Sequence, residues 1–211
     1  MKLYAISGIG ADKRAYSKLK LNADVIHLNW IDPLKNESIT DYAFRLSKSI
    51  DRTEPFCIIG VSFGGLVASE ISKITKPQLT ILLSTVETRS EIPGLYKTIG
   101  KSNIIKLIPT FLFKPPRFLL NYFFNPMNKK LLYNIVDDSD FKFVKWACHQ
   151  LTNWRNTTTL ENKLVINGEK DRLLPPIKSD LSITIKDGAH FMIADKADEV
   201  SEAINDYIAG L

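Results

Sequence analysis

Residues 56–74 read FCIIGVSFGGLVASEISKI. Their first part, Phe56 to Val61, is a near-continuous apolar run, which is typical of a strand buried on both faces of a parallel sheet. The residues from Leu66 to Ile74 have the spacing of a helix. Between the two, Gly60-Val61-Ser62-Phe63-Gly64 fits the pattern G-x-S-x-G, in which a tight turn tolerates only small flanking residues. The stretch therefore predicts a strand, a sharp turn that raises the Ser62 hydroxyl, and a helix.

Short apolar runs and helical patterns alternate along the rest of the chain. Further strands are expected at residues 2–7, 25–28, 79–84, 164–167 and 183–185, and helices at 13–20, 39–50 and 198–208. This alternation predicts an α/β fold with a mostly parallel central sheet flanked by helices. A chain of 211 residues is expected to form one domain, possible insertions included. We expect residues 1–88 and 160–211 to form the core, and residues 89–159 to form a helical cap inserted into it.

The turn makes Ser62 a candidate nucleophile, because it presents the hydroxyl at the edge of the sheet. The alternative is a glycine-rich turn in which Ser62 only caps the following helix. A serine hydroxyl needs an adjacent base to react at neutral pH. Among the three histidines, His190 is expected to be that base, since it follows the last strand on a loop before the final helix. His27, inside a strand, and His149, in the insertion, are interpreted as structural.

The histidine in turn needs a carboxylate that fixes its tautomer and stabilises the imidazolium. Asp171 is expected to supply it, because it follows a predicted strand and lies between the serine and the histidine in the sequence. Glu169, shortly before it, and Glu87, after an earlier strand, remain alternatives. The non-catalytic interpretation of Asp171 is a solvated loop carboxylate paired with Arg172.

Acyl transfer also requires donors for the oxyanion that develops on the attacked carbonyl. We expect the backbone N–H groups of Phe63, next to the serine, and of Ile9, in the loop Ser7–Gly10 after the first strand. The glycines of that loop do not indicate a nucleotide site. The third glycine of a dinucleotide fingerprint is missing, and Lys13 stands in its place.

Together these residues resemble the α/β-hydrolase superfamily. The resemblance is carried by the Gly60–Gly64 turn, by the stretch from Gly168 through Asp171 to Pro175, and by Gly188-Ala189-His190. It is specific to the superfamily and not to one activity. One position departs from the pattern, because members often carry His-Gly in the oxyanion loop where this chain has Ser7-Gly8.

The resemblance covers about residues 2–85 and 164–210. It implies hydrolysis, without a cofactor, of esters, thioesters or amides. The reaction we expect is cleavage of an ester or thioester with a small to medium hydrophobic acyl group, through an acyl-enzyme on Ser62. The same catalytic residues would also suit an acyltransferase, an amidase or a hydrolase of carbon–carbon bonds. An alternative of another class is a non-catalytic ligand-binding or sensor protein on the same scaffold.

The predicted insertion has an unusual composition. Residues 92–136 contain no Asp or Glu and seven Lys or Arg, so this segment carries +7 and the rest of the chain sums to −2. Residues 104–124 are very apolar, but prolines and cations interrupt them too often for a transmembrane helix. We expect a pair of short helices that bury their apolar faces on the core. A second interpretation is that the segment lines an acyl pocket and contacts an anionic substrate or membrane.

Other partners are not indicated by the sequence. The basic residues are mixed with proline and bulky apolar residues, so no nucleic acid is expected, and the partner is a small-molecule acyl substrate. Cys57 and Cys148 are interpreted as buried thiols, and no metal site is expected. The first residues lack the pattern of a signal peptide, which favours a cytoplasmic location.

Overall fold

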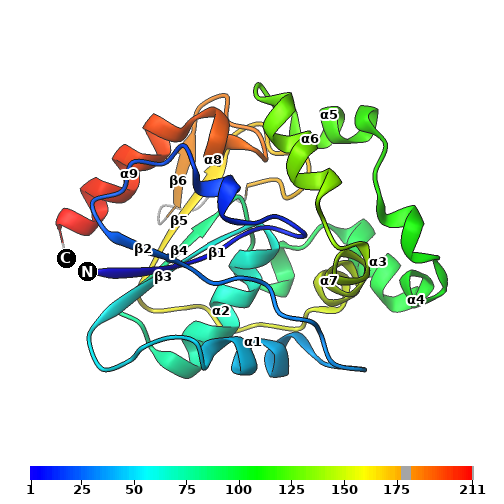
Figure 1. Ribbon diagram of the computed structural model, residues 1–211, viewed down its shortest axis with the longest axis horizontal. Coiled ribbons are helices and arrows are strands. Elements are labelled where there is room, and N and C mark those ends of the chain that lie inside the picture. The colour runs from blue at the N-terminus through cyan, green and yellow to red at the C-terminus, as the bar shows by residue number, and fades with distance from the viewer. Residues whose placement is uncertain (177–181, 211) are drawn as a thin grey trace.

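The structure, a computed structural model, describes residues 1–176 and 182–210. Within these residues six strands form one parallel sheet in the order β2-β1-β3-β4-β5-β6 (Figure 1). The strands are β1 (Lys2–Ile6), β2 (Asp24–His27), β3 (Phe56–Val61), β4 (Leu79–Leu83), β5 (Lys163–Gly168) and β6 (Ser182–Ile185). The prediction of a parallel α/β sheet is confirmed, and β3 has the expected bounds.

Helices cover both faces of the sheet (Figure 1). One face carries α1 (Ile39–Ser47) and α2 (Phe63–Thr75); the other carries η1 (Lys13–Tyr16), α8 (Met192–Asp195) and α9 (Ala197–Ala209). Successive side chains of a strand point to opposite faces, so Tyr4 and Ile6 enter the first core while Leu3 and Ala5 enter the second. Burial on both faces explains why β3 is apolar throughout.

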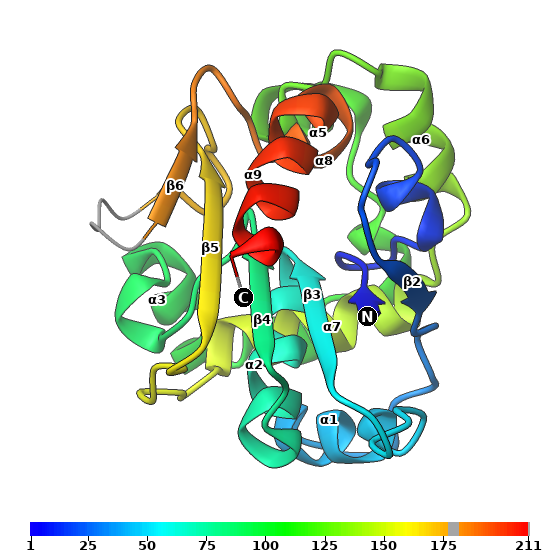
Figure 2. The ribbon, with the colours of Figure 1, turned by 90° about the vertical axis from the view of Figure 1, so that its left-hand side faces the viewer.

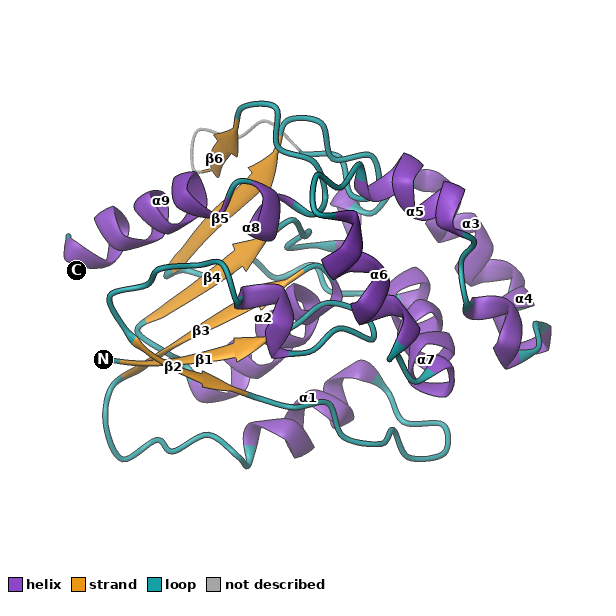
Figure 3. Ribbon diagram, turned by 45° about the horizontal axis from the view of Figure 1, so that its top comes forward, coloured by secondary structure: helices purple, strands orange, loops and turns teal. Residues whose placement is uncertain are grey.

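The chain between β4 and β5 is helical. It forms η2 (Arg89–Glu91), α3 (Gly94–Ser102), α4 (Ile104–Leu107), η3 (Thr110–Phe113), α5 (Arg117–Phe124), α6 (Lys129–Asp137) and α7 (Phe141–Asn153). Figure 3 shows α3, α4 and α5 beyond the carboxyl ends of the strands. The start of β1 and the end of α9 lie at the other end of the sheet (Figures 1 and 2). The boundaries of this segment as an inserted cap remain a prediction.

The expectation that residues 104–124 bury their apolar faces on the core is wrong. Leu107 is 82% exposed, Phe111 is 73% exposed and Phe118 is 69% exposed. The helices here are short, and proline residues precede both η3 and α5. Breaks of this kind prevent one continuous apolar stripe from lying against the core. Only a few side chains of the segment, such as Ile105 and Leu120, are buried.

A second correction concerns residues 13–20, where a full helix was expected. The structure has only the 3₁₀ helix η1 (Lys13–Tyr16) there, with Asp12 as its N-cap. The chain then turns toward α9, where the backbone N–H of Lys20 donates to Ser201 Oγ at 2.9 Å. Cys148 is half-buried rather than buried, although Cys57 is buried as expected. No helix in the described ranges is long and apolar enough to cross a membrane.

Candidate active site

Ser62 lies at a strained turn between β3 and α2. Its backbone has φ 55° and ψ −124°, a conformation that residues other than glycine rarely adopt. A Cβ at Gly60 would overlap Gly64 O, and a Cβ at Gly64 would overlap Ser7 O and Ile6 O. Ser62 occupies the N-cap position of α2, yet its hydroxyl makes no capping hydrogen bond. The capping alternative therefore fails, and the hydroxyl is available for other partners.

The structure brings Ser62, His190 and Asp171 together in one hydrogen-bonded chain. Ser62 Oγ lies 3.0 Å from His190 Nε2, and His190 Nδ1 lies 2.8 Å from Asp171 Oδ2. The histidine and the aspartate are both buried, and the serine is half-buried. The three residues are distant in sequence but meet at the carboxyl ends of β3 and β5 and on the loop after β6. This is the geometry of a nucleophile, its base and an orienting carboxylate.

Backbone groups hold Asp171 in place. Its second oxygen, Oδ1, accepts the N–H groups of Leu173 and Leu174, each at 2.9 Å. This leaves Oδ2 directed at His190. The loops that carry the two residues are also bonded, because the N–H of Lys170 donates to Gly188 O at 2.7 Å. Asp171 and His190 thus lie on two loops that are hydrogen-bonded to each other.

The alternative carboxylates are engaged elsewhere. Glu87 Oε1 accepts Lys163 Nζ at 2.8 Å and the N–H of Leu160 at 2.6 Å. Glu169 Oε2 accepts the N–H of Asp187 at 3.0 Å. Neither has a hydrogen bond to His190, whose Nδ1 is bonded to Asp171. The geometry thus favours Asp171 among the three carboxylates.

The other two histidines lie apart from this chain. His27 ends β2, with its ring centroid 5.5 Å from that of Tyr16. His149 lies in α7. Burial lowers the pKa of both side chains, and nearby lysines, Lys13 for His27 and Lys106 for His149, lower it further. A depressed pKa favours the neutral imidazole, which agrees with the structural interpretation of these two residues.

The loop after β1 lies directly against the serine. A Cβ at Gly8 would stand 3.5 Å from Ser62 Cβ, in ordinary van der Waals contact, so the loop and the serine are direct neighbours. Within the described part of the chain, the backbone N–H groups of Ile9 and Phe63 donate to no other residue. Ser7, in the same loop, donates its hydroxyl to Ala11 O at 2.6 Å. The two free N–H groups are the expected donors to an oxyanion.

Several contacts around the site were not anticipated from the sequence. Trp30 Nε1 donates to Gly8 O at 3.2 Å and so fixes the loop after β1. Thr85 Oγ1 donates to the carbonyl oxygen of Ser62 at 2.7 Å, which ties the strained turn to the end of β4. The ring of Phe124 meets the imidazole of His190 edge-on, with centroids 5.1 Å apart. No short sequence pattern signals these contacts, because each joins residues that lie more than twenty positions apart in the chain.

The Trp30→Phe variant is expected to lower kcat about fivefold, since one neutral hydrogen bond contributes about 1 kcal/mol. The phenyl ring would keep the packing against Phe143, whose ring centroid is 4.8 Å from that of Trp30. The matched control is Trp146→Phe, which loses a similar bond to Glu37 O at 3.1 Å. Turnover of nitrophenyl esters measures both variants. Equal losses in the two would contradict a role for Trp30 in holding the loop.

Gly64→Ala is expected to destabilise the fold by about 3 kcal/mol, because the new Cβ would overlap backbone oxygens of Ile6 and Ser7. This is the upper end of the usual cost of an overpacked substitution. Gly94→Ala is the control, since a Cβ there meets nothing within 4 Å. Replacing that glycine at the start of α3 should change stability by no more than about 1 kcal/mol, in the stabilising direction. Urea unfolding followed by circular dichroism gives both values. Similar midpoints for the two variants would contradict the steric argument.

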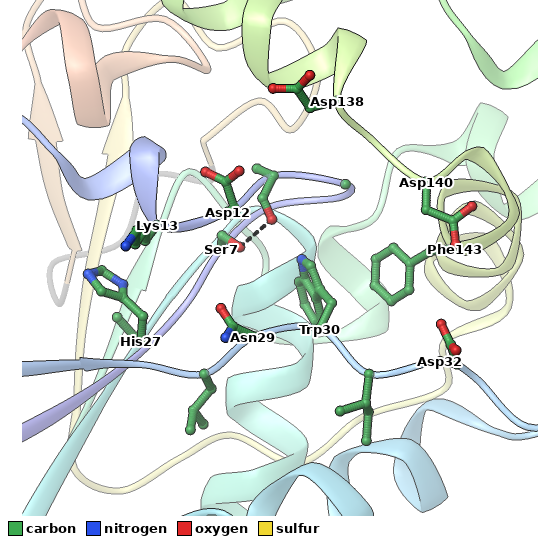
Figure 4. Close-up of a pocket in the computed structure, with 15 residues that line it drawn as sticks. Ser7, Asp12, Lys13, His27, Asn29, Trp30, Asp32, Asp138, Asp140 and Phe143 are labelled. Atoms are coloured by element: carbon green, nitrogen blue, oxygen red, sulfur yellow. Dashed lines mark hydrogen bonds between the residues drawn. The ribbon is translucent and has the colours of Figure 1, made fainter.

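A cavity of about 240 Å³ lies beside the loop after β1 (Figure 4). Its wall includes Ser7, Trp30, Phe143 and four carboxylates, and neither Ser62 nor His190 is among its lining residues. The carboxylates are Asp12, Asp32, Asp138 and Asp140. Two of them, Asp12 and Asp138, form ion pairs with Arg14. In the described residues no group of three His, Cys, Asp or Glu side chains is placed to hold a metal ion.

Comparison with known proteins connects this geometry to a fold. No protein-family model matches the sequence, and no curated protein matches it significantly. Solved structures match over almost the whole chain. A thermophilic esterase from Thermogutta terrifontis has a TM-score of 0.75 at 15% identity, covering 100% of this chain and 90% of its own.

Two further structures give the same result. A lipase-esterase related protein from Clostridium acetobutylicum has a TM-score of 0.68 at 14% identity, covering 98% of this chain and 93% of its own. A membrane phospholipase A, described as a bacterial virulence factor, has a TM-score of 0.70 at 17% identity, covering 99% of this chain and 78% of its own. The chain therefore has the fold of the α/β-hydrolase superfamily.

Proposed function

We propose that the protein is a serine hydrolase that cleaves an ester or thioester of a small to medium hydrophobic acyl group. The observation that carries this proposal is the chain of hydrogen bonds from Ser62 Oγ through His190 to Asp171, at 3.0 Å and 2.8 Å. A strained serine whose hydroxyl meets a buried histidine, rather than capping its own helix, is explained by nucleophilic catalysis. The fold shared with esterases and lipases supports the same assignment.

The reaction proceeds through an acyl-enzyme. Ser62 Oγ attacks the carbonyl carbon while His190 Nε2 takes its proton, and Asp171 stabilises the resulting imidazolium. The N–H groups of Ile9 and Phe63 donate to the oxyanion. When the tetrahedral intermediate collapses, the bond to the leaving group breaks and His190 returns the proton to that group. Water, deprotonated by His190, then attacks the acyl-enzyme and releases the acid and Ser62.

Other reactions would use the same residues. An acyltransferase would replace the water with another acceptor, and an amidase or a carbon–carbon hydrolase would differ in the leaving group. Hydrophobic side chains beside the base favour an apolar substrate, because Phe124 packs edge-on against His190. The sequence also favours a peripheral contact of the basic segment with an anionic membrane.

Covalent labelling tests the assignment. A fluorophosphonate probe should modify the wild-type protein at one position, which peptide mass spectrometry should place at Ser62. A panel of nitrophenyl esters of increasing chain length then sizes the acyl site. Turnover that falls for long or charged acyl groups would agree with a small hydrophobic pocket. A folded protein that resists the probe and hydrolyses no ester would favour the ligand-binding alternative instead.

A further inference from the structure

The outward surface of the segment between β4 and β5 is unusually apolar. Among the described residues, nine of the fifteen exposed large apolar side chains lie between Leu95 and Met127, so exposure is concentrated in one segment. We call this surface the cap face and define it by its most prominent apolar members. These are Leu95, Ile104, Leu107, Phe111, Leu112 and Phe118, each between 49% and 82% exposed. Concentrated apolar exposure marks a binding surface.

The cap face is also strongly basic. Its segment carries seven cations and no carboxylate between residues 92 and 136. Asp137, just beyond it, pairs with Lys114 at 3.1 Å and with Arg117. The remaining five cations form no ion pair with any described residue; they are Lys97, Lys101, Lys106, Lys129 and Lys130. The surface therefore combines free positive charge with exposed apolar side chains.

The elements that carry these side chains share one edge of the molecule. In Figures 1 and 3, α3, α4 and α5 follow one another along the side opposite the chain termini. Phe111 and Leu112 lie in η3, a four-residue turn between Pro109 and Lys114. Elements this short cannot span a bilayer, but their exposed apolar side chains can enter its interfacial layer. The cap face is thus built for shallow contact.

The charge decides between possible occupants. A second copy of the chain, seated face to face, would bring together two basic segments, each with five cations that form no ion pair with a described residue. A polyanion such as a nucleic acid would satisfy the lysines but leave Leu107 and Phe111 in water. An anionic lipid layer offers phosphates for the lysines and an acyl region for the apolar tips.

We propose that the cap face docks on anionic lipid surfaces, with Leu107, Phe111 and Leu112 among the acyl chains and the lysines at the headgroup phosphates. The same segment contacts His190, the proposed catalytic base. Phe124, at the end of α5, packs against His190, and Tyr122 O accepts Arg172 Nη1 at 3.1 Å. Docking would place the triad near the lipid surface. Resting on the proposed function, the substrate is then an ester or thioester with a small to medium apolar acyl group that partitions into that surface.

Vesicle co-sedimentation tests docking without any catalytic step. The Ser62→Ala protein should bind phosphatidylcholine vesicles that contain phosphatidylglycerol, and should bind pure phosphatidylcholine much more weakly. Replacing Lys97, Lys101 and Lys106, which lie in α3 and α4, with glutamine should weaken binding about a hundredfold, at about fivefold for each lysine near a charged surface. Replacing Leu107, Phe111 and Leu112 with serine should also weaken binding at least about tenfold.

The matched control places the same changes on another exposed region. Leu34 is 58% exposed and Lys35 is exposed, and both precede α1. Leu34→Ser with Lys35→Gln should leave vesicle binding unchanged. Absent binding by the parent protein, or binding that survives both sets of cap-face changes, would overturn the proposal. A dimer in sedimentation velocity that only the serine variant loses would overturn it too, in favour of a second copy.

Activity on two substrates separates docking from catalysis. In the protein with Ser62 intact, the cap-face variants should lose hydrolysis of vesicle-borne esters and keep turnover of a short, soluble nitrophenyl ester. Loss of both activities to the same extent would overturn the role of the cap face in substrate delivery. If the parent protein docks but hydrolyses neither substrate, the proposed function fails while docking stands.

Discussion

Replacing Ser62 with alanine is expected to lower kcat for ester hydrolysis on the order of 10⁶-fold, the scale seen when a triad nucleophile is removed. The reason is that Oγ, 3.0 Å from His190 Nε2, is the only atom of the triad that bonds to the acyl group. The fold should persist, because Ser62 Oγ makes no capping bond to α2. Stopped assays with nitrophenyl esters and circular dichroism measure the two properties.

Ser84 supplies a matched control for that variant. It follows β4, the strand next to β3, and like Ser62 it has a positive φ, 45°. Its side-chain oxygen is buried without a hydrogen-bond partner among the described residues. Ser84→Ala should therefore keep full activity, and removing a buried unpaired hydroxyl should not reduce stability. If Ser62→Ala keeps more than a small fraction of the wild-type rate, another nucleophile performs the reaction.

The sequence predicted the strand, turn and helix around Ser62, the proposed nucleophile, because their signal is local. An apolar strand, two glycines and a helix are adjacent in residues 56–74. Gly60 is required sterically by Gly64 and Ala68, only a few residues away, although Gly64 also meets the backbone of Ile6 and Ser7. His190 and Asp171 were also predictable, since each follows a recognisable strand and parallel strands end at one edge of the sheet. For these residues, local pattern and topology agree.

The contacts that support the triad were not predictable in the same way. Trp30 and Gly8, or Phe124 and His190, are separated by long stretches of chain and meet only after the sheet and the helices have packed. The exposure of Leu107 and Phe111 was missed for a related reason. Apolar periodicity shows that a helix has an apolar face, but whether that face is buried depends on what packs against it. The residues of the helix alone do not show which other elements will cover its apolar face.

Asp171→Asn is expected to lower kcat about 10⁴-fold with little change in the fold. The amide keeps the shape of the carboxylate, and its oxygen can still accept the N–H groups of Leu173 and Leu174. The amide nitrogen then faces His190 Nδ1 and requires that atom to act as an acceptor. The proton moves to Nε2, which can no longer take the proton of Ser62. The charge that stabilises the imidazolium is lost as well.

Glu87→Gln is the control for this variant, because Glu87 is one of the two alternative acidic residues considered for the same role. It weakens the ion pair with Lys163, in which both side chains are largely buried, and should lower thermal stability while leaving kcat unchanged. Steady-state kinetics on one ester and thermal unfolding of the two variants separate these effects. The expected outcome is an active, less stable Glu87→Gln protein and a stable, inactive Asp171→Asn protein. The reverse result would show that Glu87, and not Asp171, orients the catalytic histidine.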